Sequence, residues 1–248
     1  MRETLTVVIG GEAGQGLATV GDLLTQMLAA AGYHFVTFQG YHSRIRGGHN
    51  TYAIKICPSD ISGPEDMADL VLSLNAETDQ LDGPRLRPEG LLLAFGPDAA
   101  TPQGASAITV PFADLSSPRE MNLVALGILT GILGLPLAEA SKVVDDLFKN
   151  KGGSEKPLAG LKAGYYWAES NKLGGRYQVS PAVPGHPPRL VITGNEALAL
   201  GAAAGGANFC SFYPMSPATT VALSLADWAA NAGLVVEQAE DEIAAANM

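Results

Sequence analysis

The chain has little positive charge, few cysteines and no long apolar run, and each scarcity excludes a class of protein. Of its 248 residues 15 are basic and 25 are acidic, which argues against a nucleic-acid partner because phosphate contacts need a basic face. Cys57 and Cys210 lie far apart, so this chain alone cannot supply the four thiolates of an iron–sulfur cluster. The longest apolar stretch, 123–138, is broken by glycines and Pro136 and is too short for a membrane span of about 20 residues.

Two further absences concern targeting and metal binding. Residues 4–9 lead directly into a glycine turn and do not form a signal peptide, so we expect a cytoplasmic protein without a membrane partner. His34, His42 and His49 lack the spacing of metal ligands, and we expect no metal site in this chain.

Short apolar runs alternate with segments of helical periodicity, which is typical of an α/β protein with a doubly wound parallel sheet. The hydrophobic content of 47% is enough for a sizeable core. Strands are predicted at 5–9, 35–38, 52–57, 70–74, 91–95 and, more weakly, 108–112. Helices are predicted at 17–31, 119–133, 137–149 and 157–171.

The segment 174–188 is rich in proline and glycine and has no periodicity, which predicts a linker between two domains. The first domain would cover 1–173 and the second would begin at 189. Beyond the linker, strands are predicted at 190–192, 209–212 and 234–237, with helices at 195–205 and 218–230. We therefore expect a complete first α/β domain followed by the start of a second, and a natural polypeptide that continues past residue 248.

A glycine turn joins the first predicted strand to the first helix. Gly11, Gly14 and Gly16 lie where a phosphate-binding loop would lie. The spacing is G-x-x-G-x-G rather than that of a dinucleotide site, and Glu12 would repel a pyrophosphate. The residues alone leave two interpretations open: ligand binding, or a tight turn that lets strand and helix pack closely.

A second turn, between the second and third predicted strands, carries Arg44 and Arg46 beside two glycines. The guanidinium fork can bind two oxygens of a phosphate or a carboxylate. A solvated loop, or an arginine paired with an acidic partner across an interface, accounts for the pattern equally well.

Two motifs near the end of the chain contain side chains suited to chemistry. Pro214 and Pro217 restrict the backbone on both sides of Ser216, which holds the hydroxyl in one place, although Ser216 could equally cap the following helix. Glu242 lies in an acidic, Ala-rich segment that predicts a helix start, where a carboxylate could equally complement the helix dipole.

Together these segments resemble the fused γ–α subunit of the 2-oxoacid:ferredoxin oxidoreductases, over nearly the whole chain. Residues 11–16 and 43–48 resemble the γ-domain signature, and residues 194–197, 213–217 and 238–245 resemble the start of the thiamine-binding α domain. Two positions depart from the family pattern, since Ser216 stands where the family usually has threonine and Ala13 replaces a glycine.

The resemblance implies a CoA-dependent oxidative decarboxylation of a 2-oxoacid, with 2-oxoglutarate favoured over pyruvate, and electrons passed to ferredoxin. Glu242 would hydrogen-bond the pyrimidine of thiamine diphosphate, while Ser216, with Tyr213 and Pro217, would contact the substrate. The residues Gly11, Gly14, Gly16, Arg44 and Arg46 would bind coenzyme A or form an interface.

The resemblance also implies partners. A β subunit would carry the diphosphate site with its Mg²⁺ and a 4Fe-4S cluster, and two αβ heterodimers would associate. The chain alone should then be catalytically silent. The alternative is a noncatalytic scaffold that docks partner chains and binds coenzyme A.

Overall fold

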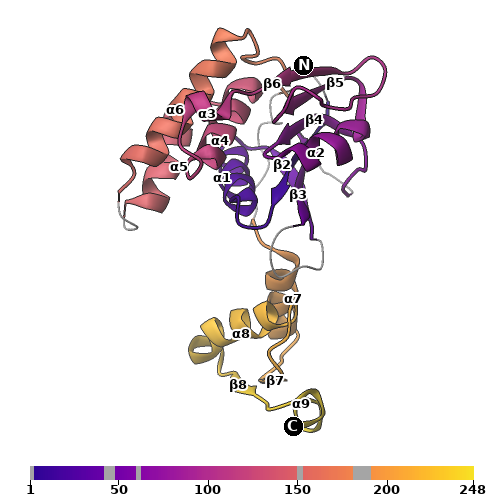
Figure 1. The fold of residues 1–248 in the computed structure, drawn as a ribbon. Coiled ribbons are helices and arrows are strands. Elements are labelled where there is room, and N and C mark those ends of the chain that lie inside the picture. Colours follow the sequence, from indigo (N-terminus) through magenta and orange to yellow (C-terminus); the bar gives the residue numbers. More distant parts are fainter. Residues whose placement is uncertain (1–2, 42–47, 60–62, 150–152, 181–190) are drawn as a thin grey trace. The chain divides into compact units, whose positions relative to one another are not determined.

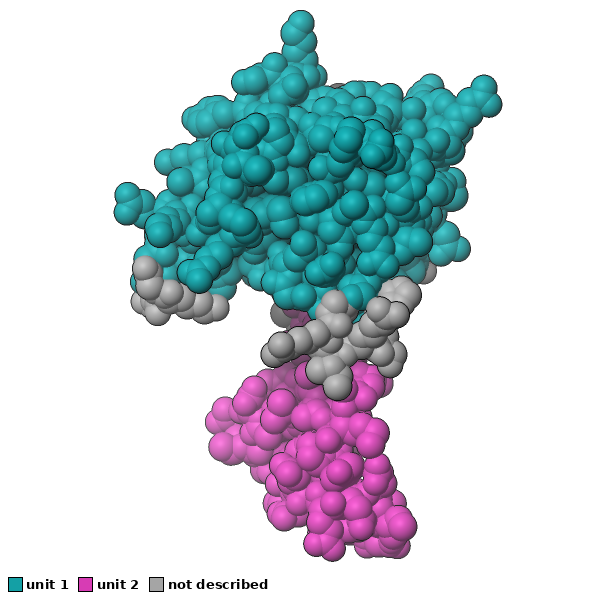
Figure 2. All heavy atoms as spheres, viewed as in Figure 1, with its two compact units in different colours: residues 1–186 teal, residues 187–248 magenta. Residues whose placement is uncertain are grey.

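The computed structural model describes residues 3–41, 48–59, 63–149, 153–180 and 191–248. The chain divides into two compact units, residues 1–186 and 187–248, drawn in different colours in Figure 2. We describe each unit by itself. None of the helices in the described ranges is long and apolar enough to cross a membrane.

The first unit is built on a six-stranded sheet in the order β2-β3-β1-β4-β5-β6. The strands are β1 (Leu5–Glu12), β2 (His34–Gly40), β3 (His49–Cys57), β4 (Ala68–Ser73), β5 (Leu86–Ala94) and β6 (Ser106–Thr109). β1, β4, β5 and β6 run parallel to one another, which confirms the α/β class and the parallel core of the sheet. β6 ends at Thr109, and the run predicted as a strand to residue 112 turns there into a short helix.

The other half of the sheet departs from the all-parallel prediction. β3 pairs antiparallel with both β1 and β2, so the sheet is mixed. The reason is the short connection 41–48 between β2 and β3, since a parallel crossover needs a dozen or more residues.

Helices lie on both faces of this sheet. They are α1 (Leu17–Ala30), α2 (Ala76–Leu81), α3 (Phe112–Leu115), α4 (Met121–Leu133), α5 (Leu137–Phe148) and α6 (Glu155–Ser170), with a 3₁₀ turn η1 (Gly83–Arg85). α1, α4, α5 and α6 gather beside the sheet in Figure 1, and their apolar side chains form one core with those of β1, β3 and β4. The opposite face holds a smaller cluster around Val8, Val71 and Leu92, covered in part by Ala99 and Ala105.

α4 and α6 approach so closely that only glycine fits at two positions. A Cβ at Gly127 would clash with the carbonyl oxygen of Leu161, and one at Gly164 with that of Val124. α4 is buried along nearly its whole length as a result, which explains why it is apolar on all sides.

The packing of the first unit continues into the segment predicted as a linker. The Tyr177 side chain is 2% exposed and its hydroxyl donates to the carbonyl of Glu89 (3.0 Å). Val179 is also buried, and its carbonyl accepts from the hydroxyl of Tyr33 (3.3 Å). Residues 181–190 lie outside the described ranges. The assignment of 1–173, 174–188 and 189–248 to a γ domain, a linker and the start of an α domain stays a prediction.

The second unit comprises α7 (Gly194–Ala204), β7 (Phe209–Phe212), α8 (Thr219–Ala232), β8 (Val235–Gln238) and α9 (Glu242–Asn247). β7 and β8 form a parallel pair, and a small core lies around Ala199, Leu225 and Leu234. The strand predicted at 190–192 is wrong for its described part, since Val191 and Ile192 are exposed and in no strand. Thr193 and Glu196 form a capping box that starts α7 directly afterwards.

Candidate functional site

The glycine turn connects β1 to α1. Gly11 is still part of β1, whereas Gly14 and Gly16 adopt positive φ angles of 94° and 80° that favour glycine. Gly16 is also the N-cap of α1, and a Cβ there would lie 2.5 Å from Nδ2 of Asn122. Both the backbone conformation and the close approach of α4 therefore require glycine at this position.

The side chain of Gln15 stabilises the turn through two hydrogen bonds. Its Oε1 accepts from the backbone N–H of Glu12 (2.7 Å), and its Nε2 donates to the carbonyl of Leu74 (3.2 Å). A Cβ at Gly11 would lie 2.5 Å from the same Oε1. These contacts favour the tight-turn interpretation, in which the glycines allow close packing between β1, α1 and the end of β4.

The turn lies at the topological switch point of the sheet, where the chain leaves two neighbouring strands toward opposite sides. From β1 the chain continues to β2 on one side, and from β4 it continues to β5 on the other. In open α/β sheets ligands bind at the carboxyl ends of strands at such a switch point. Residues 10–16 and 73–75 lie at these two carboxyl ends, and we take them as the candidate site of the first unit.

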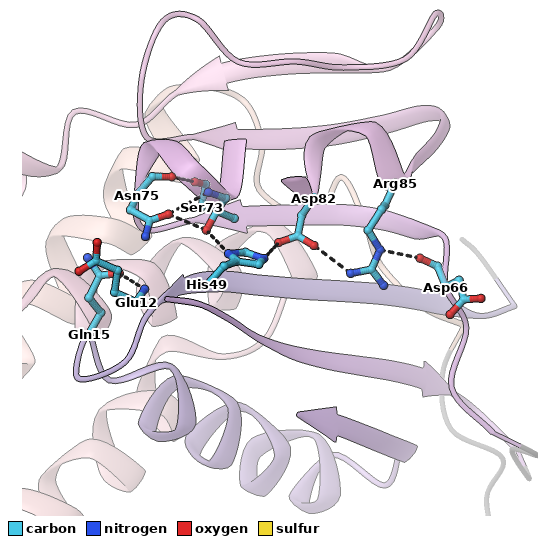
Figure 3. Close-up of polar contacts among 9 residues, drawn as sticks. Glu12, Gln15, His49, Asp66, Ser73, Asn75, Asp82 and Arg85 are labelled. Atoms are coloured by element: carbon cyan, nitrogen blue, oxygen red, sulfur yellow. Dashed lines mark hydrogen bonds and ion pairs between the residues drawn. The ribbon is translucent and has the colours of Figure 1, made fainter. Parts of the chain in front are cut away.

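A buried polar cluster borders this site (Figure 3). His49, the first residue of β3, lies with its Nε2 2.8 Å from Oδ2 of Asp82. The other oxygen of Asp82 accepts from Nη1 of Arg85 (2.8 Å), whose Nε donates to the carbonyl of Asp66 (3.1 Å). Since Asp82 is 2% exposed, these two cationic or polar partners offset the cost of burying its charge.

The cluster continues through Thr78 to Asn75. The Thr78 hydroxyl lies 3.4 Å from Nδ1 of His49 and donates to Oδ1 of Asn75 (2.8 Å). The same Oδ1 accepts from the backbone N–H of Thr78 (2.9 Å), so that Asn75 is the N-cap of α2. A Cβ at Gly10 would clash with Thr78, which places the cluster directly against the end of β1.

Reasoning from the sequence missed this cluster and named His49 only among the histidines that lack the spacing of metal ligands. One signal was available, because Asn75 follows the apolar run 70–74 and has the position of a helix N-cap. The partnership of Asp82 with His49 has no signal in the sequence, since it depends on how β3 pairs with β1. Arg44 and Arg46 of the arginine turn lie outside the described residues.

The second unit brings its two predicted motifs to one edge. Tyr213 follows β7 and Glu242 follows β8, and the carboxyl ends of parallel strands meet at the same edge of a sheet. The hydroxyl of Ser211 donates to the carbonyl of Ala245, which holds α9 against β7. The Ser216 and Glu242 segments therefore lie on the same side of the β7–β8 pair.

The structure excludes the capping role of Ser216 but agrees with the helix-dipole role of Glu242. Ser216 does not cap α8, which begins at Thr219 with Ala218 as N-cap and no side-chain cap. Ser216 and Pro217 are exposed, and Tyr213 is half-buried. Glu242 is exposed in the first turn of α9, where its charge complements the helix dipole, and Asp241 caps the helix by accepting from the N–H of Ala244 (2.6 Å).

No group of three or more histidine, cysteine or acidic side chains that could hold a metal ion occurs among the residues described in the structure. Within the second unit, the Ser216 hydroxyl and the Glu242 carboxylate remain the predicted ligand contacts.

Two family models match the chain. Residues 6–167 match the model described as pyruvate ferredoxin/flavodoxin oxidoreductase. Residues 200–248 match the model described as pyruvate flavodoxin/ferredoxin oxidoreductase, thiamine diP-bdg.

Curated relatives agree with these matches. The 2-oxoacid:ferredoxin oxidoreductase subunit alpha of a Sulfolobus species is 24% identical, over 98% of this chain and 47% of its own length. The 2-oxoglutarate oxidoreductase subunit KorA of Mycobacterium tuberculosis is 25% identical, over 97% of this chain and 43% of its own length. The chain thus spans about half the length of the curated relatives it matches.

Solved structures extend the likeness to the fold. The 2-oxoglutarate:ferredoxin oxidoreductase of Magnetococcus marinus, solved with 2-oxoglutarate, coenzyme A and succinyl-CoA bound, matches 99% of this chain and 45% of its own, with a TM-score of 0.85 and 27% identity. The keto/oxoacid ferredoxin oxidoreductase gamma subunit of Geobacter sulfurreducens matches 68% of this chain and 98% of its own, with a TM-score of 0.55 and 20% identity.

Proposed function

We propose, from the premise that this chain belongs to the pyruvate ferredoxin/flavodoxin oxidoreductase family, that it is the γ–α part of a 2-oxoacid:ferredoxin oxidoreductase. The reaction is the CoA-dependent oxidative decarboxylation of a 2-oxoacid, with electrons passed to ferredoxin. The observation that carries this proposal is the joint position of Ser216 and Glu242 after two adjacent parallel strands, within the part of the chain that matches a thiamine diphosphate-binding model.

Glu242 would hold the pyrimidine end of thiamine diphosphate. Its carboxyl lies at the start of α9, where it can hydrogen-bond a ring nitrogen and hold a proton there. When bound, thiamine diphosphate supplies the carbon nucleophile and electron sink that decarboxylation of a 2-oxoacid requires. The exposure of Glu242 in this unit fits such a role, because a cofactor can reach the carboxyl.

Ser216 would orient the substrate. Its hydroxyl stands on a turn between Pro214 and Pro217, where the backbone has few alternatives, and can donate to a substrate carboxylate. Tyr213 and Pro217 would form the adjoining surface. We propose 2-oxoglutarate as the substrate, which the names of the M. tuberculosis and M. marinus relatives support.

Coenzyme A would bind at the glycine turn of the first unit. Gly11, Gly14 and Gly16 would line the coenzyme site at the switch point, where a Cβ at Gly14 would meet no atom within 4 Å, and Arg46, with Arg44, would bind an anionic group of the coenzyme. The coenzyme A bound to the M. marinus relative supports this assignment.

The partners follow from the groups that this chain does not supply among its described residues. We propose a β subunit that holds the diphosphate with Mg²⁺ and carries the 4Fe-4S cluster, since two cysteines cannot ligate one. Ferredoxin would accept the electrons, and two αβ heterodimers would associate.

Calorimetry with thiamine diphosphate and Mg²⁺ tests the shared cofactor site. The purified chain should show no saturable binding, whereas the complex with its β subunit should bind the cofactor and reduce a ferredoxin or viologen acceptor with 2-oxoglutarate and coenzyme A. Tight binding to the chain alone would contradict a site shared between two subunits.

The substrate and the scaffold alternative are tested in the same assay. A complex that turns over pyruvate faster than 2-oxoglutarate would overturn the substrate assignment. A complex that assembles, binds coenzyme A and has no activity with any 2-oxoacid would favour the noncatalytic scaffold.

A further inference from the structure

The two edge strands of the first unit's sheet differ in how well they are protected from pairing with another chain. Short length, prolines, charged side chains and bulges keep an edge strand from pairing in this way. β6 has four residues and is followed closely by Pro111. β2, at the other edge, has seven residues without proline, aspartate, glutamate, lysine or arginine, and all seven pair with β3 in one continuous register. Among the described strands β2 pairs with β3 alone, so its outer edge lacks these protections.

Exposed aromatic side chains lie at this edge. Phe38 of β2 is 59% exposed, and Tyr41, directly after the strand, is 72% exposed. Side chains opposite each other in paired strands share a face, so Phe38 lies on the same face as Ala53 of β3 and Val8 of β1. Ala53 and Val8 belong to the smaller apolar cluster of the sheet. Phe38 therefore ends an apolar row that is buried at its centre and open to solvent at the β2 edge.

The residues of β2 are complementary to a second copy of the same strand. In an antiparallel pair with a two-fold axis at Thr37, Val36 lies opposite Phe38 of the second copy, and symmetry forms this contact twice. Pairs of an aromatic with a β-branched side chain stabilise antiparallel sheets. Val36 of the second copy would cover Phe38, and the apolar row would continue across the axis.

The charge of the chain favours a second copy over a partner of opposite charge. Partners of opposite charge are steered and aligned by charged side chains at the interface, and β2 has no acidic residue, lysine or arginine for this purpose. Two copies with a net charge of −10 repel each other, so they associate most readily through an uncharged surface. The β2 edge is such a surface.

We propose that β2 is the surface through which two copies of this chain associate, by antiparallel β2–β2 pairing that joins their first units into one continuous sheet. The pairing involves the first unit alone and does not depend on the proposed activity. A closed two-fold dimer leaves no β2 edge for a third copy, so the association ends at two.

A lysine at each edge strand tests which edge is used. Phe38→Lys places a charge on β2, and Ser106→Lys places the same charge on β6 and is the matched control. Both positions are exposed, so both variants should melt near the wild-type temperature. In sedimentation equilibrium the purified wild-type chain and Ser106→Lys should be dimers. Phe38→Lys should raise the dimer Kd at least about tenfold, because lysine removes both apolar cross-strand contacts.

A cysteine at the proposed axis tests the register. Directly opposed residues of an antiparallel pair have Cα atoms about 4.5–5.5 Å apart, within reach of a disulfide. Thr37→Cys should therefore form a disulfide-linked dimer under mild oxidation, identified as a Cys-to-Cys peptide of that position by mass spectrometry. Thr109→Cys on β6 is the control and should not form one, and the wild-type chain measures the background from Cys57 and Cys210.

The contrary outcomes are distinct. A wild-type chain that stays monomeric both alone and in its complex would overturn the proposal, as would a dimer that Phe38→Lys does not weaken. Loss of β-subunit binding in Phe38→Lys, with a monomeric wild-type chain, would assign the edge to that partner instead. A dimer that Phe38→Lys dissociates but Thr37→Cys does not cross-link would overturn the symmetric register. The proposed function fails separately, if the assembled complex turns over no 2-oxoacid.

Discussion

The parallel strands of the two units differ in how deeply they are buried. In the first unit β4 is buried at every residue, and β1 at every residue except Glu12. In the second unit Phe209 of β7 is 44% exposed and Val235 of β8 is 57% exposed. In both pairs each strand is followed by a turn and a helix.

The difference reflects how far each unit covers the faces of its own parallel strands. Parallel strands are stable when both faces of the sheet are covered, and in the first unit helices and loops of the same chain cover both. In the second unit no residue of β7 or β8 is buried, and the candidate residues Ser216 and Glu242 are exposed. We expect the first unit to determine the stability of this chain, and the chemistry of the second to depend on the proposed complex.

The largest effect is expected in the second unit and should be confined to activity. Glu242→Gln keeps the shape of the side chain but loses the acid, so turnover of the assembled complex should fall roughly 10²–10⁴-fold if the carboxyl acts as a proton donor and acceptor. Melting should barely change, since the side chain is exposed. The measurements are kcat, exchange of the thiazolium C2 proton, and thermal unfolding.

Glu240→Gln is the control for Glu242, because it removes a neighbouring exposed carboxylate. Its turnover should stay close to that of the wild type. Near-normal C2 proton exchange in the Glu242→Gln complex would contradict the assignment and make Glu240 the next candidate.

A pair of leucines tests the comparison of the two units directly. Leu72 of β4 is 0% exposed and Leu198 of α7 is 64% exposed. Leu72→Ala should lower the free energy of unfolding by about 2–5 kcal/mol, because it leaves a cavity in the core. Leu198→Ala should change it by no more than about 0.5 kcal/mol. Urea unfolding of the purified chain measures both, and equal losses would show that the second unit is not the less buried one.

The sequence predicted what depends on local pattern. The predicted strand 70–74 and the predicted helix 119–133 differ from β4 and α4 by one or two residues at their ends. They could be predicted because the spacing of apolar residues in the sequence indicates both a buried strand and a helix. The antiparallel direction of β3 was not predictable in this way, since a buried strand has the same pattern in either direction. The strand predicted at 190–192 is wrong for Val191 and Ile192, because a short apolar run does not show whether a neighbouring strand exists to pair with it.

The same distinction holds for the candidate sites. The turn at Ser216 and the helix start at Glu242 are local features, and both occur where the pattern predicted them. The cluster of His49, Thr78 and Asp82 joins residues that are far apart in sequence, and only the strand pairing brings them together. Sequence reasoning therefore predicted the turn and the helix start of the second unit and missed the buried polar cluster of the first.

Two glycines sharpen the contrast between the units. A Cβ at Gly127 in α4 would clash with the backbone of α6, whereas a Cβ at Gly201 in α7 would meet no atom within 4 Å. Gly127→Ala should destabilise the chain by about 1–3 kcal/mol through overpacking. Gly201→Ala should stabilise it by about 0.5–1 kcal/mol, because alanine is the better helix former. Thermal and urea unfolding decide, and a neutral Gly127→Ala would mean that α4 and α6 can separate at little cost.

The smallest expected difference between the units appears as pH falls. The pKa of Glu65 in the first unit is lowered from its ordinary value of 4.5 by hydrogen bonds from Lys55 and Arg87. The ion pair to Lys55 (2.6 Å) is only partly screened, because the Glu65 side chain is 30% exposed. In the second unit the pKa of Glu196 is lowered as well, but by its hydrogen bond to the backbone of Thr193 in a fully exposed capping box.

A carboxyl whose folded-state pKa is lowered stabilises the protein above its unfolded pKa. The unfolded state takes up the proton first as pH falls, so this stabilisation is lost between pH 4.5 and the lower folded value. Glu65→Gln should therefore flatten the fall in unfolding free energy below pH 4.5, by no more than about 1 kcal/mol for so exposed a pair, and high salt should have the same effect. Asp66→Asn, a change at the next and exposed residue, is the control and should leave the slope unchanged. If Glu65→Gln keeps the wild-type slope at low salt, the Lys55–Glu65–Arg87 contact contributes nothing to stability, and the first unit relies on its apolar core alone.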